Sequence, residues 1–262
     1  MVNFSFGKNW LRFIKHLDNQ RIEEAEKDLI AFAGDLKGKT FLDIGCGSGL
    51  SSLAAWKAGA KKIVSVDIDK DSVKCTKILK SKYAHDADWK IIQASILDPK
   101  KIGRSDIVYS WGVLHHTGNM YQAFDNITTL VKPKGLLWIA IYNKYAGPVD
   151  INKLWWQVKK FYNQTGPLFR EIMFLLYGGS FFIYKLLLGE NPWKQIANYK
   201  QNRGMRWADD VRDWLGGFPY EFASVDEIVN YFAKLGCYCK KVNYRGGIAC
   251  NDYLFIKVGN IA

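Results

Sequence analysis

The sequence predicts an α/β fold with a mostly parallel sheet and helices on both faces. Short apolar runs alternate with amphipathic stretches between Thr40 and Ile141, the pattern of βαβ units in a parallel sheet. The first apolar run leads directly into a glycine-rich turn. With 262 residues, of which 48% are hydrophobic, the chain can bury the core of one such domain that carries an insertion.

Seven strands are expected, five of them parallel. The parallel strands are predicted at residues 40–44, 63–66, 89–93, 106–110 and 136–141. Three helices are predicted between them, at residues 50–58, at residues 71–83 and at residues 120–131. Asp71 is expected to cap the second of these helices. Ser224 and Glu227 form a capping box for a helix to Leu235, and residues 237–244 and 253–258 then read as an antiparallel pair.

An aromatic-rich and helical insertion interrupts this pattern between Ala146 and Gln201. Its centre, residues 172–184, carries no charge but is shorter than the roughly 20 residues that a membrane-spanning helix needs. Two interpretations follow: a lid over the open end of the sheet, or a helix lying at a membrane interface.

The net charge of +12 leaves several partners open. Lys and Arg are spread as pairs such as Lys61-Lys62 and Lys240-Lys241, without the long basic run of a nucleic-acid tail. We therefore expect a generally basic surface, a small-molecule acceptor and no nucleic-acid partner, while the oligomeric state stays open.

The five cysteines show neither C-x-x-C nor zinc-finger spacing, so reduced thiols are expected. The N-terminus lacks the apolar core and the cleavage site of a signal peptide, which predicts a cytoplasmic location.

The glycine-rich turn has the sequence F-L-D-I-G-C-G-S-G at residues 41–49. Glycines let the chain turn sharply and bring backbone N–H groups to a ligand at a helix N-terminus. The spacing is G-x-G-x-G, not the G-x-G-x-x-G of pyrophosphate sites. Asp43 would repel a pyrophosphate and attract an ammonium group, so a ligand with a cationic end is indicated.

Asp67 ends the second predicted strand. An acidic side chain there can accept hydrogen bonds from both ribose hydroxyls of an adenosine. A ligand that is cationic at one end and a nucleoside at the other is S-adenosylmethionine, which leaves as S-adenosylhomocysteine.

Four segments resemble the class I S-adenosylmethionine-dependent methyltransferases: D-I-G-C-G-S-G at 43–49, V-D-I-D at 66–69, D-I-V-Y-S-W-G-V-L-H-H at 106–116 and K-P-K-G-L-L-W-I-A-I-Y-N at 132–143. The resemblance implies a Rossmann-like, mostly parallel seven-stranded sheet with an antiparallel last strand. It divides the chain into an N-terminal helical segment (1–39), an S-adenosylmethionine-binding core (40–145), a helical lid insertion (146–202) and the C-terminal part of the core sheet (203–262). The F-G-K-N-W start and D-W-L-G-G-F-P-Y-E resemble bacterial small-molecule methyltransferases near the quinol methylases.

The resemblance also implies which residues hold the cofactor. Asp43 and the glycine turn would hold the methionine part, and Asp67 the ribose. The loop after the third strand commonly offers an aspartate to the adenine, but Ser95 stands there, so backbone groups and apolar stacking are expected to bind the adenine instead. The cofactor set is Asp43, Ile44, Gly45, Cys46, Gly47, Gly49, Asp67, Ile68, Ser95, Ile96 and Trp111.

Methyl transfer from a sulfonium is an in-line displacement, and a general base assists when the acceptor is a hydroxyl. His115 and His116 follow the fourth strand at the end where open α/β sheets bind ligands, so they are the candidate bases. The alternative is that an imidazole there only hydrogen-bonds a backbone carbonyl. No metal-ligand cluster is evident, and no metal is predicted.

Five further residues are candidates for substrate contact, each with a structural alternative. Tyr142 and Asn143 can bind substrate or cap the fifth strand, Arg203 and Glu221 belong to a segment where surface ion pairs would also explain the charges, and a tryptophan is often simply packed. The predicted substrate set is Trp10, Tyr142, Asn143, Arg203 and Glu221.

The sequence therefore predicts an enzyme that O-methylates a small, anionic metabolite, such as a phosphorylated or nucleotide-linked intermediate or a surface-glycan precursor. One alternative is methylation of a prenylated quinol or another lipid, with peripheral membrane contact through the insertion. RNA methylation is supported by charge alone, and a protein that only binds the cofactor is the last alternative.

Overall fold

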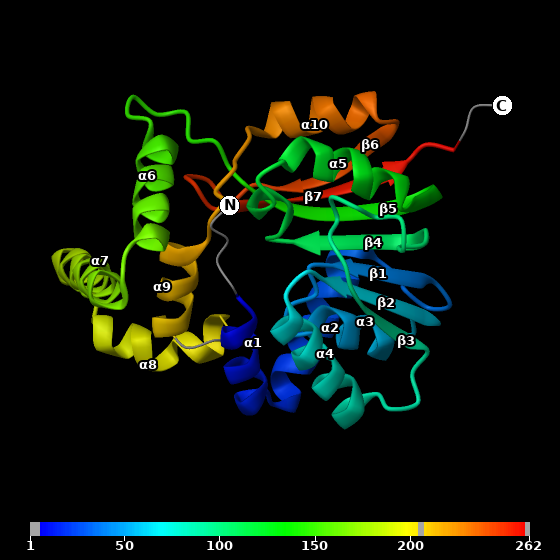
Figure 1. Ribbon diagram of the computed structural model, residues 1–262, viewed down its shortest axis with the longest axis horizontal. Helices are drawn as coiled ribbons and strands as arrows, with labels where there is room; N and C mark the ends of the chain where they lie inside the picture. Colours follow the sequence, from blue (N-terminus) through cyan, green and yellow to red (C-terminus); the bar gives the residue numbers. More distant parts are fainter. Residues whose placement is uncertain (1–5, 204–206, 260–262) are drawn as a thin grey trace. The chain divides into compact units, whose positions relative to one another are not determined.

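The computed structural model describes residues 6–203 and 207–259 and contains a seven-stranded sheet (Figure 1). The strand order is β3-β2-β1-β4-β5-β7-β6. The strands are β1 (Thr40–Ile44), β2 (Lys62–Asp67), β3 (Trp89–Gln93), β4 (Ser105–Trp111), β5 (Val131–Tyr142), β6 (Cys237–Asn243) and β7 (Cys250–Lys257).

The first five strands in that order are parallel, whereas β7 runs antiparallel to β5 and β6 antiparallel to β7. The mostly parallel, seven-stranded sheet predicted from the sequence is confirmed. The carboxyl ends of the five parallel strands therefore lie along the same side of the sheet, which we call the carboxyl edge. The glycine turn after β1 lies at this carboxyl edge.

The boundary between α5 (Met120–Thr129) and β5 differs from the prediction. The expected helix ran to Val131 and the expected strand began at Leu136. Instead, Val131 pairs with Ser105 of β4 and is fully buried. This strand pairing makes Val131 the first residue of β5 and not the last residue of the helix. Its β-branched side chain suits a buried strand position.

Five more helices accompany the sheet. They are α1 (Gly7–Phe13), α2 (Asn19–Ala33), α3 (Leu50–Lys57), α4 (Lys70–Tyr83) and α10 (Val225–Lys234). The predicted capping box of Ser224 and Glu227 is present at α10. The predicted cap at Asp71 is wrong: Asp69 has the extended backbone of a cap and accepts the N–H group of Asp71, which already lies in the helix.

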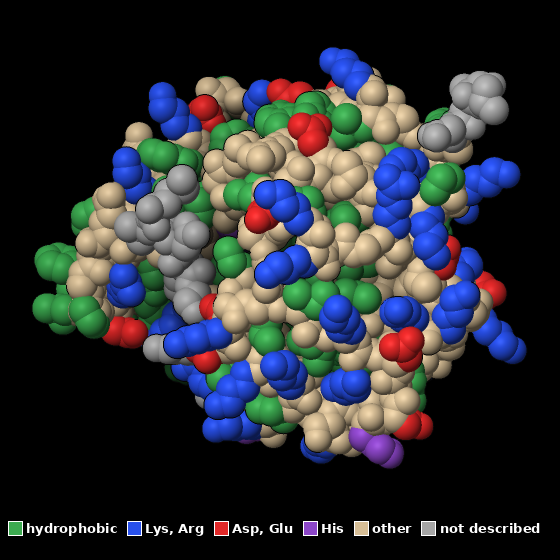
Figure 2. Space-filling model, turned by 45° about the vertical axis from the view of Figure 1, so that its right-hand side comes forward, with side chains coloured by type: hydrophobic (Ala, Val, Ile, Leu, Met, Phe, Trp, Pro, Cys, Tyr) green, Lys and Arg blue, Asp and Glu red, His purple; other side chains and the backbone are tan. Residues whose placement is uncertain are grey.

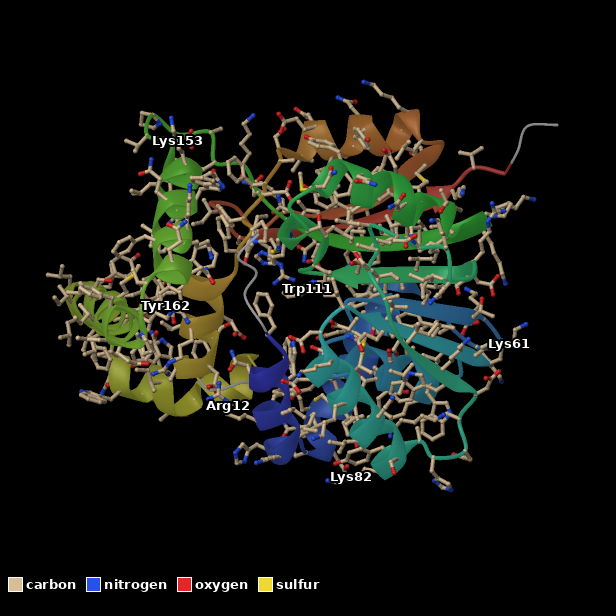
Figure 3. All side chains as sticks on the ribbon, viewed as in Figure 1. Arg12, Lys61, Lys82, Trp111, Lys153 and Tyr162 are labelled. Carbon is tan, nitrogen blue, oxygen red and sulfur yellow. The ribbon has the colours of Figure 1, made fainter. Side chains whose placement is uncertain are left out.

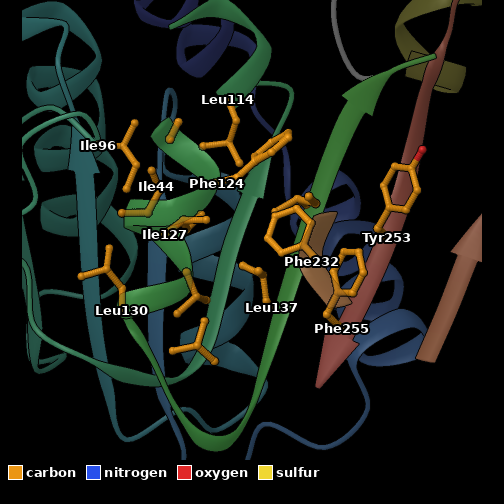
Figure 4. Close-up of a cluster of buried hydrophobic side chains, with 14 of the residues drawn as sticks. Ile44, Ile96, Leu114, Phe124, Ile127, Leu130, Leu137, Phe232, Tyr253 and Phe255 are labelled. Atoms are coloured by element: carbon orange, nitrogen blue, oxygen red, sulfur yellow. The ribbon is translucent and has the colours of Figure 1, made fainter. Parts of the chain in front are cut away.

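Two hydrophobic cores cover the two faces of the sheet. On one face, Phe124 and Ile127 of α5 and Phe232 of α10 pack against strand residues such as Leu137 (Figure 4). On the other face, the core is built from α2, α3 and α4, with Leu53 among its fully buried members. The packed faces hold the strand ends in fixed positions, and these ends carry the site.

Residues 153–220 form a second compact unit, which we call the helical unit; the described residues through Asn152 and from Glu221 onward form the sheet unit. The helical unit contains most of α6 (Ile151–Gln164) together with α7 (Pro167–Leu187), α8 (Pro192–Arg203) and α9 (Trp207–Gly216). Val211 and Leu215 of α9 pack with Tyr162 of α6, so this unit extends beyond the predicted boundary at residue 202. The role of this unit as a lid stays a prediction.

The helix α7 leaves much of its apolar surface exposed. Hydrophobic side chains gather at the left-hand edge of the space-filling view, while Lys and Arg are scattered over the rest of that face (Figure 2). In the part of the chain that the structure describes, none of the helices combines the length and the hydropathy of a membrane-spanning segment.

Candidate functional site

The glycine turn after β1 is hydrogen-bonded to the end of β2. Gly45, Gly47 and Gly49 have φ values of +75°, +52° and +83°, which L-residues with a Cβ rarely adopt. The N–H groups of Gly45 and Cys46 donate to the carbonyl of Val66 at 2.7 and 3.0 Å. The turn is therefore a fixed structure directly before the first turn of α3.

Neighbouring side chains also pack too closely on this turn for any larger residue. A Cβ atom on Gly47 would lie 2.8 Å from Nε1 of Trp10, and one on Gly49 would lie 2.8 Å from Cγ2 of Thr76. Trp10, a predicted substrate residue, thus has its indole beside the glycine turn, and its contact with a substrate stays a prediction. The buried thiol of Cys46 contacts Oγ1 of Thr76 at 3.3 Å.

Asp67 reaches from the end of β2 to the glycine turn. Its Oδ2 accepts the N–H group of Gly47 at 2.9 Å, and its Oδ1 accepts that of Asp69 at 2.9 Å. Burial raises the pKa of this carboxyl group, and the backbone bonds oppose that rise. The adjacent side chain of Ile68 is 65% exposed, which leaves an apolar surface beside the carboxylate.

Asp43 is enclosed between β1 and the start of α3, with only 2% of its surface exposed. Its Oδ2 accepts the hydroxyl of Ser52 at 2.6 Å, Ser52 and Ser65 share a hydrogen bond of 2.6 Å, and Nε1 of Trp89 donates to Ser65 at 2.7 Å. Burial raises the pKa of Asp43 to about 7, the Ser52 bond opposes that rise and the charge of Asp67 adds to it. A nearby cation would stabilise the ionised form.

The partners of Asp43 were not predicted from the sequence. Ser52, Ser65 and Trp89 come from a helix and two strands, and serine in a buried helix or strand carries no distinctive pattern. Only the fold brings them to one carboxylate.

The loop after β3 forms a turn at Ser95, the residue at which the sequence resemblance predicted the adenine site. The Ser95 hydroxyl accepts the N–H group of Leu97 at 3.1 Å, so it closes the local turn. Ile96 is buried, and its carbonyl accepts a bond of 2.8 Å from Nδ2 of Asn126. Adenine binding through backbone and apolar groups of this loop stays a prediction. Ile44 lies in the core, so only its backbone is available to a ligand.

A short 3-10 helix, Leu114–His116, follows β4 and brings the two histidines to the end of β5. His115 is fully buried, its ring centroid lies 4.1 Å from that of Tyr142, and its Nδ1 accepts the Tyr142 N–H group at 3.4 Å. His116 is only partly buried, and its ring lies 5.6 Å from the Tyr142 ring. His115 is therefore packed in the interior, and His116 is the more accessible of the two imidazoles.

Glu221 lies beside this histidine turn. Its N–H group donates to the carbonyl of His115 at 2.9 Å, and its Oε1 accepts the N–H group of Met120 at 3.1 Å, at the start of α5. Its Oε2 is buried and has no hydrogen-bond partner among the described residues. Burial raises the pKa of this carboxyl group, which suits a proton acceptor.

Three predicted residues remain: Asn143, Trp111 and Arg203. Asn143 is buried, and its Nδ2 donates to the carbonyl of Gly247 at 2.7 Å, which joins the end of β5 to the connection between β6 and β7. Trp111 lies at the end of β4 and donates from Nε1 to Oδ1 of Asp252 at 2.6 Å (Figure 3). Arg203 belongs to α8 of the helical unit, and its side chain lies outside the described residues.

Residues 17–172 match the family model described as "Methyltransferase domain". This match covers more than half of the 262 residues. The chain belongs to this methyltransferase family. Its assignment from the sequence to the class I, Rossmann-like methyltransferases is thereby confirmed.

Curated relatives of this methyltransferase match over part of their length. A ribosomal protein L11 methyltransferase of Tolumonas auensis is 33% identical over 106 residues, which are 40% of this chain and 35% of the relative. A ubiquinone biosynthesis O-methyltransferase of Pelagibacter ubique is 27% identical over 142 residues, which are 53% of this chain and 55% of the relative. The chain thus spans about a third to a half of the length of these relatives.

Solved methyltransferase structures share the fold at low sequence identity. The magnesium protoporphyrin IX methyltransferase of Synechocystis with bound S-adenosylhomocysteine is 15% identical, with a TM-score of 0.54 and coverage of 91% of this chain and 82% of that chain. The 1,6-didemethyltoxoflavin-N1-methyltransferase of Burkholderia thailandensis, also with bound S-adenosylhomocysteine, is 13% identical, with a TM-score of 0.51 and coverage of 92% and 80%. These likenesses support the architecture of the methyltransferase.

Proposed function

We propose that this methyltransferase transfers the methyl group of S-adenosylmethionine to a hydroxyl group of a small anionic acceptor. The observation that carries the cofactor assignment is the pair of carboxylates at the glycine turn, the buried one of Asp43 and the partly buried one of Asp67. Asp43 has a pKa of about 7 because of burial, and Asp67 accepts the N–H group of Gly47. The first would gain from a cationic amino group, and the second is placed to receive ribose hydroxyls.

The residues present fit this cofactor. When bound, S-adenosylmethionine supplies an electrophilic methyl group. Ile68 offers an exposed apolar surface beside the glycine turn, and the carboxylates of Asp43 and Asp67 can balance positive charge. The protein's part in an in-line displacement is to hold the acceptor oxygen in line with the methyl group and to exclude water.

We assign the proton-accepting role to the histidine turn, with His116 as the base and Glu221 beside it. His116 is partly accessible, whereas Glu221 has one buried carboxylate oxygen with no partner among the described residues. A positioned base contributes roughly 100- to 10,000-fold to a rate of this kind.

The test is the formation of S-adenosylhomocysteine with matched acceptors, such as 3,4-dihydroxybenzoate and the neutral catechol. The carboxylated acceptor should react faster, and His116→Ala and Glu221→Gln should each lower kcat by at least about tenfold. Asp98→Asn, on an exposed carboxylate, is the matched control and should change nothing. If both His115→Ala and His116→Ala keep near-normal turnover, no histidine is the base, and faster reaction of catechol would contradict the anionic acceptor.

A second candidate function, methylation of a prenylated quinol or another lipid, is favoured by the surface of α7. Six of its apolar residues, at i, i+4, i+7, i+8, i+15 and i+19 counted from Leu168, lie on one side of the helix and are all exposed by at least 41%. This stripe consists of Leu168, Ile172, Leu175, Leu176, Ile183 and Leu187.

Co-sedimentation with anionic liposomes separates the two candidates. For a lipid acceptor we expect binding that Leu176→Asp abolishes and that Ile30→Asp, on the exposed surface of α2, preserves. Absence of binding at low salt would contradict the lipid candidate.

A further inference from the structure

A buried carboxylate in β7 organises the carboxyl edge of the sheet. Asp252 is 1% exposed and accepts hydrogen bonds from four side chains. The donors are Nε1 of Trp111 at 2.6 Å, Nε1 of Trp138 at 3.4 Å, Nδ2 of Asn243 at 3.2 Å and Nη2 of Arg245 at 2.7 Å. These bonds compensate the cost of burying the charge.

The pairing of β1, β4, β5 and β7 places this cluster near the glycine turn. Asp252 pairs with Ala140 of β5, and Ala140 pairs with Trp111 of β4. Tyr109 pairs with Asp43 of β1. Because residues two apart share a face of a sheet, Trp111 lies on the face of Tyr109 and Asp43, one step closer to the carboxyl edge.

Two members of the cluster remain open to solvent. The Trp111 residue is 40% exposed, and the Arg245 side chain is 42% exposed, with its guanidinium carbon 6.0 Å from the Trp111 ring centroid. Arg245 has five N–H donors, and the only side-chain bond found for them within the described residues is the one to Asp252. The backbone of Arg245 is also held, because its N–H group donates to Oδ1 of Asn251 at 2.9 Å.

Packing alone does not require an exposed tryptophan and an exposed guanidinium to share one buried carboxylate. An arginine held by a carboxylate on one side keeps its remaining donors for a second anion, at a reduced loss of side-chain entropy. The neighbouring indole offers a flat apolar surface.

We propose that Trp111 and Arg245 form the acceptor subsite, in which an aromatic ring lies against Trp111 and a carboxylate or phosphate on that ring binds Arg245. Asp252 is the positioning residue that fixes both side chains. This inference rests on the proposed function and names its acceptor class: an anionic aromatic compound. Trp111, which the sequence assigned to the cofactor, then belongs to the acceptor side.

The test compares two probes of similar shape, phenyl phosphate and benzyl alcohol, by calorimetry with and without saturating S-adenosylhomocysteine. Wild-type protein should bind phenyl phosphate at least about tenfold more tightly, since a charged hydrogen-bonded contact exceeds a neutral one by this order. Arg245→Gln should remove that preference. Arg104→Gln, which removes the same charge before the amino end of β4, should preserve it.

Asp252→Asn separates positioning from simple packing. It should reduce the preference for phenyl phosphate, whereas a purely structural role would weaken both probes equally. Trp111→Leu should weaken both probes while the preference persists.

Three results would overturn the subsite: a preference that survives in Arg245→Gln, an equal loss in Arg104→Gln, or a loss of S-adenosylhomocysteine affinity in Arg245→Gln with unchanged probe binding. The last result would assign Arg245 to the carboxylate of the cofactor. Failure of wild-type protein to bind S-adenosylhomocysteine would instead contradict the proposed function, and the probe preference measured without it still decides the subsite.

Discussion

Acidification is expected to weaken S-adenosylmethionine binding through Asp43. With a pKa of about 7 from burial, this carboxyl group is roughly half ionised at about pH 7 and roughly 3% ionised at about pH 5.5. If only the ionised form attracts the ammonium group, the affinity should fall about 15-fold over this range. The ligand's own amino group stays protonated throughout this range, since its ordinary pKa is about 8.

Calorimetry at several pH values measures this dependence. Asp43→Asn should bind the cofactor weakly at every pH and with little slope, because an amide does not titrate. The same variant controls for the pH dependence of every other group, because it changes only residue 43. A slope that persists in Asp43→Asn, or a flat profile in the wild-type protein, would refute the assignment of the cationic group to Asp43.

Three further outcomes follow from the same structure. Ser52→Ala removes a hydrogen bond that opposes the effect of burial on the pKa of Asp43, so the midpoint of the pH profile should move to higher pH; an unchanged midpoint would show that the bond is unimportant. Gly47→Ala should destabilise the fold by roughly 1–2 kcal/mol and abolish cofactor binding, because φ is +52° and the new Cβ would meet Trp10, and both are measurable by urea unfolding and calorimetry. Phe124→Ala, in the core beneath α5, should lower the free energy of unfolding by about 3–5 kcal/mol, and a cost below roughly 1 kcal/mol would contradict its full burial.

The pKa of Asp43 also affects stability. The folded-state value of about 7 exceeds the ordinary 3.8, so the stabilising effect of the protonated group is lost as the pH rises through about 7. At about pH 8, Asp43→Asn should therefore unfold at higher urea concentration than the wild-type protein, by the equivalent of roughly 2–4 kcal/mol. A wild-type protein that is the more stable of the two at this pH would contradict the buried-carboxylate description.

The sequence revealed the sheet because its signals are local. Each parallel strand is a short apolar run, and the capping box of Ser224 and Glu227 needs only four consecutive positions. The glycine turn and Asp67 could likewise be located from the sequence, because the turn directly follows the first strand and Asp67 is the last residue of the second. Errors arose where tertiary pairing decided the outcome, as at Val131, which β4 draws into the sheet.

The site could be predicted only in part, because its supporting contacts join distant positions. Trp111 and Asp252 are 141 residues apart, and Arg245 had no motif to mark it. Asn143 and His115 were correctly located at the carboxyl edge, but burial, which sequence patterns do not resolve for polar residues, decides how much of them a ligand can reach. The α9 helix showed dense charges, yet Val211 and Leu215 tie it to the helical unit.

The most direct test of the cofactor assignment is a calorimetric comparison of S-adenosylmethionine with a nicotinamide dinucleotide. Asp43 at the glycine turn predicts saturable binding of S-adenosylmethionine, no binding of the dinucleotide, and loss of the former in Asp67→Asn but not in Asp98→Asn. Absence of S-adenosylmethionine binding at millimolar concentration, or preferential binding of the dinucleotide, would contradict the account.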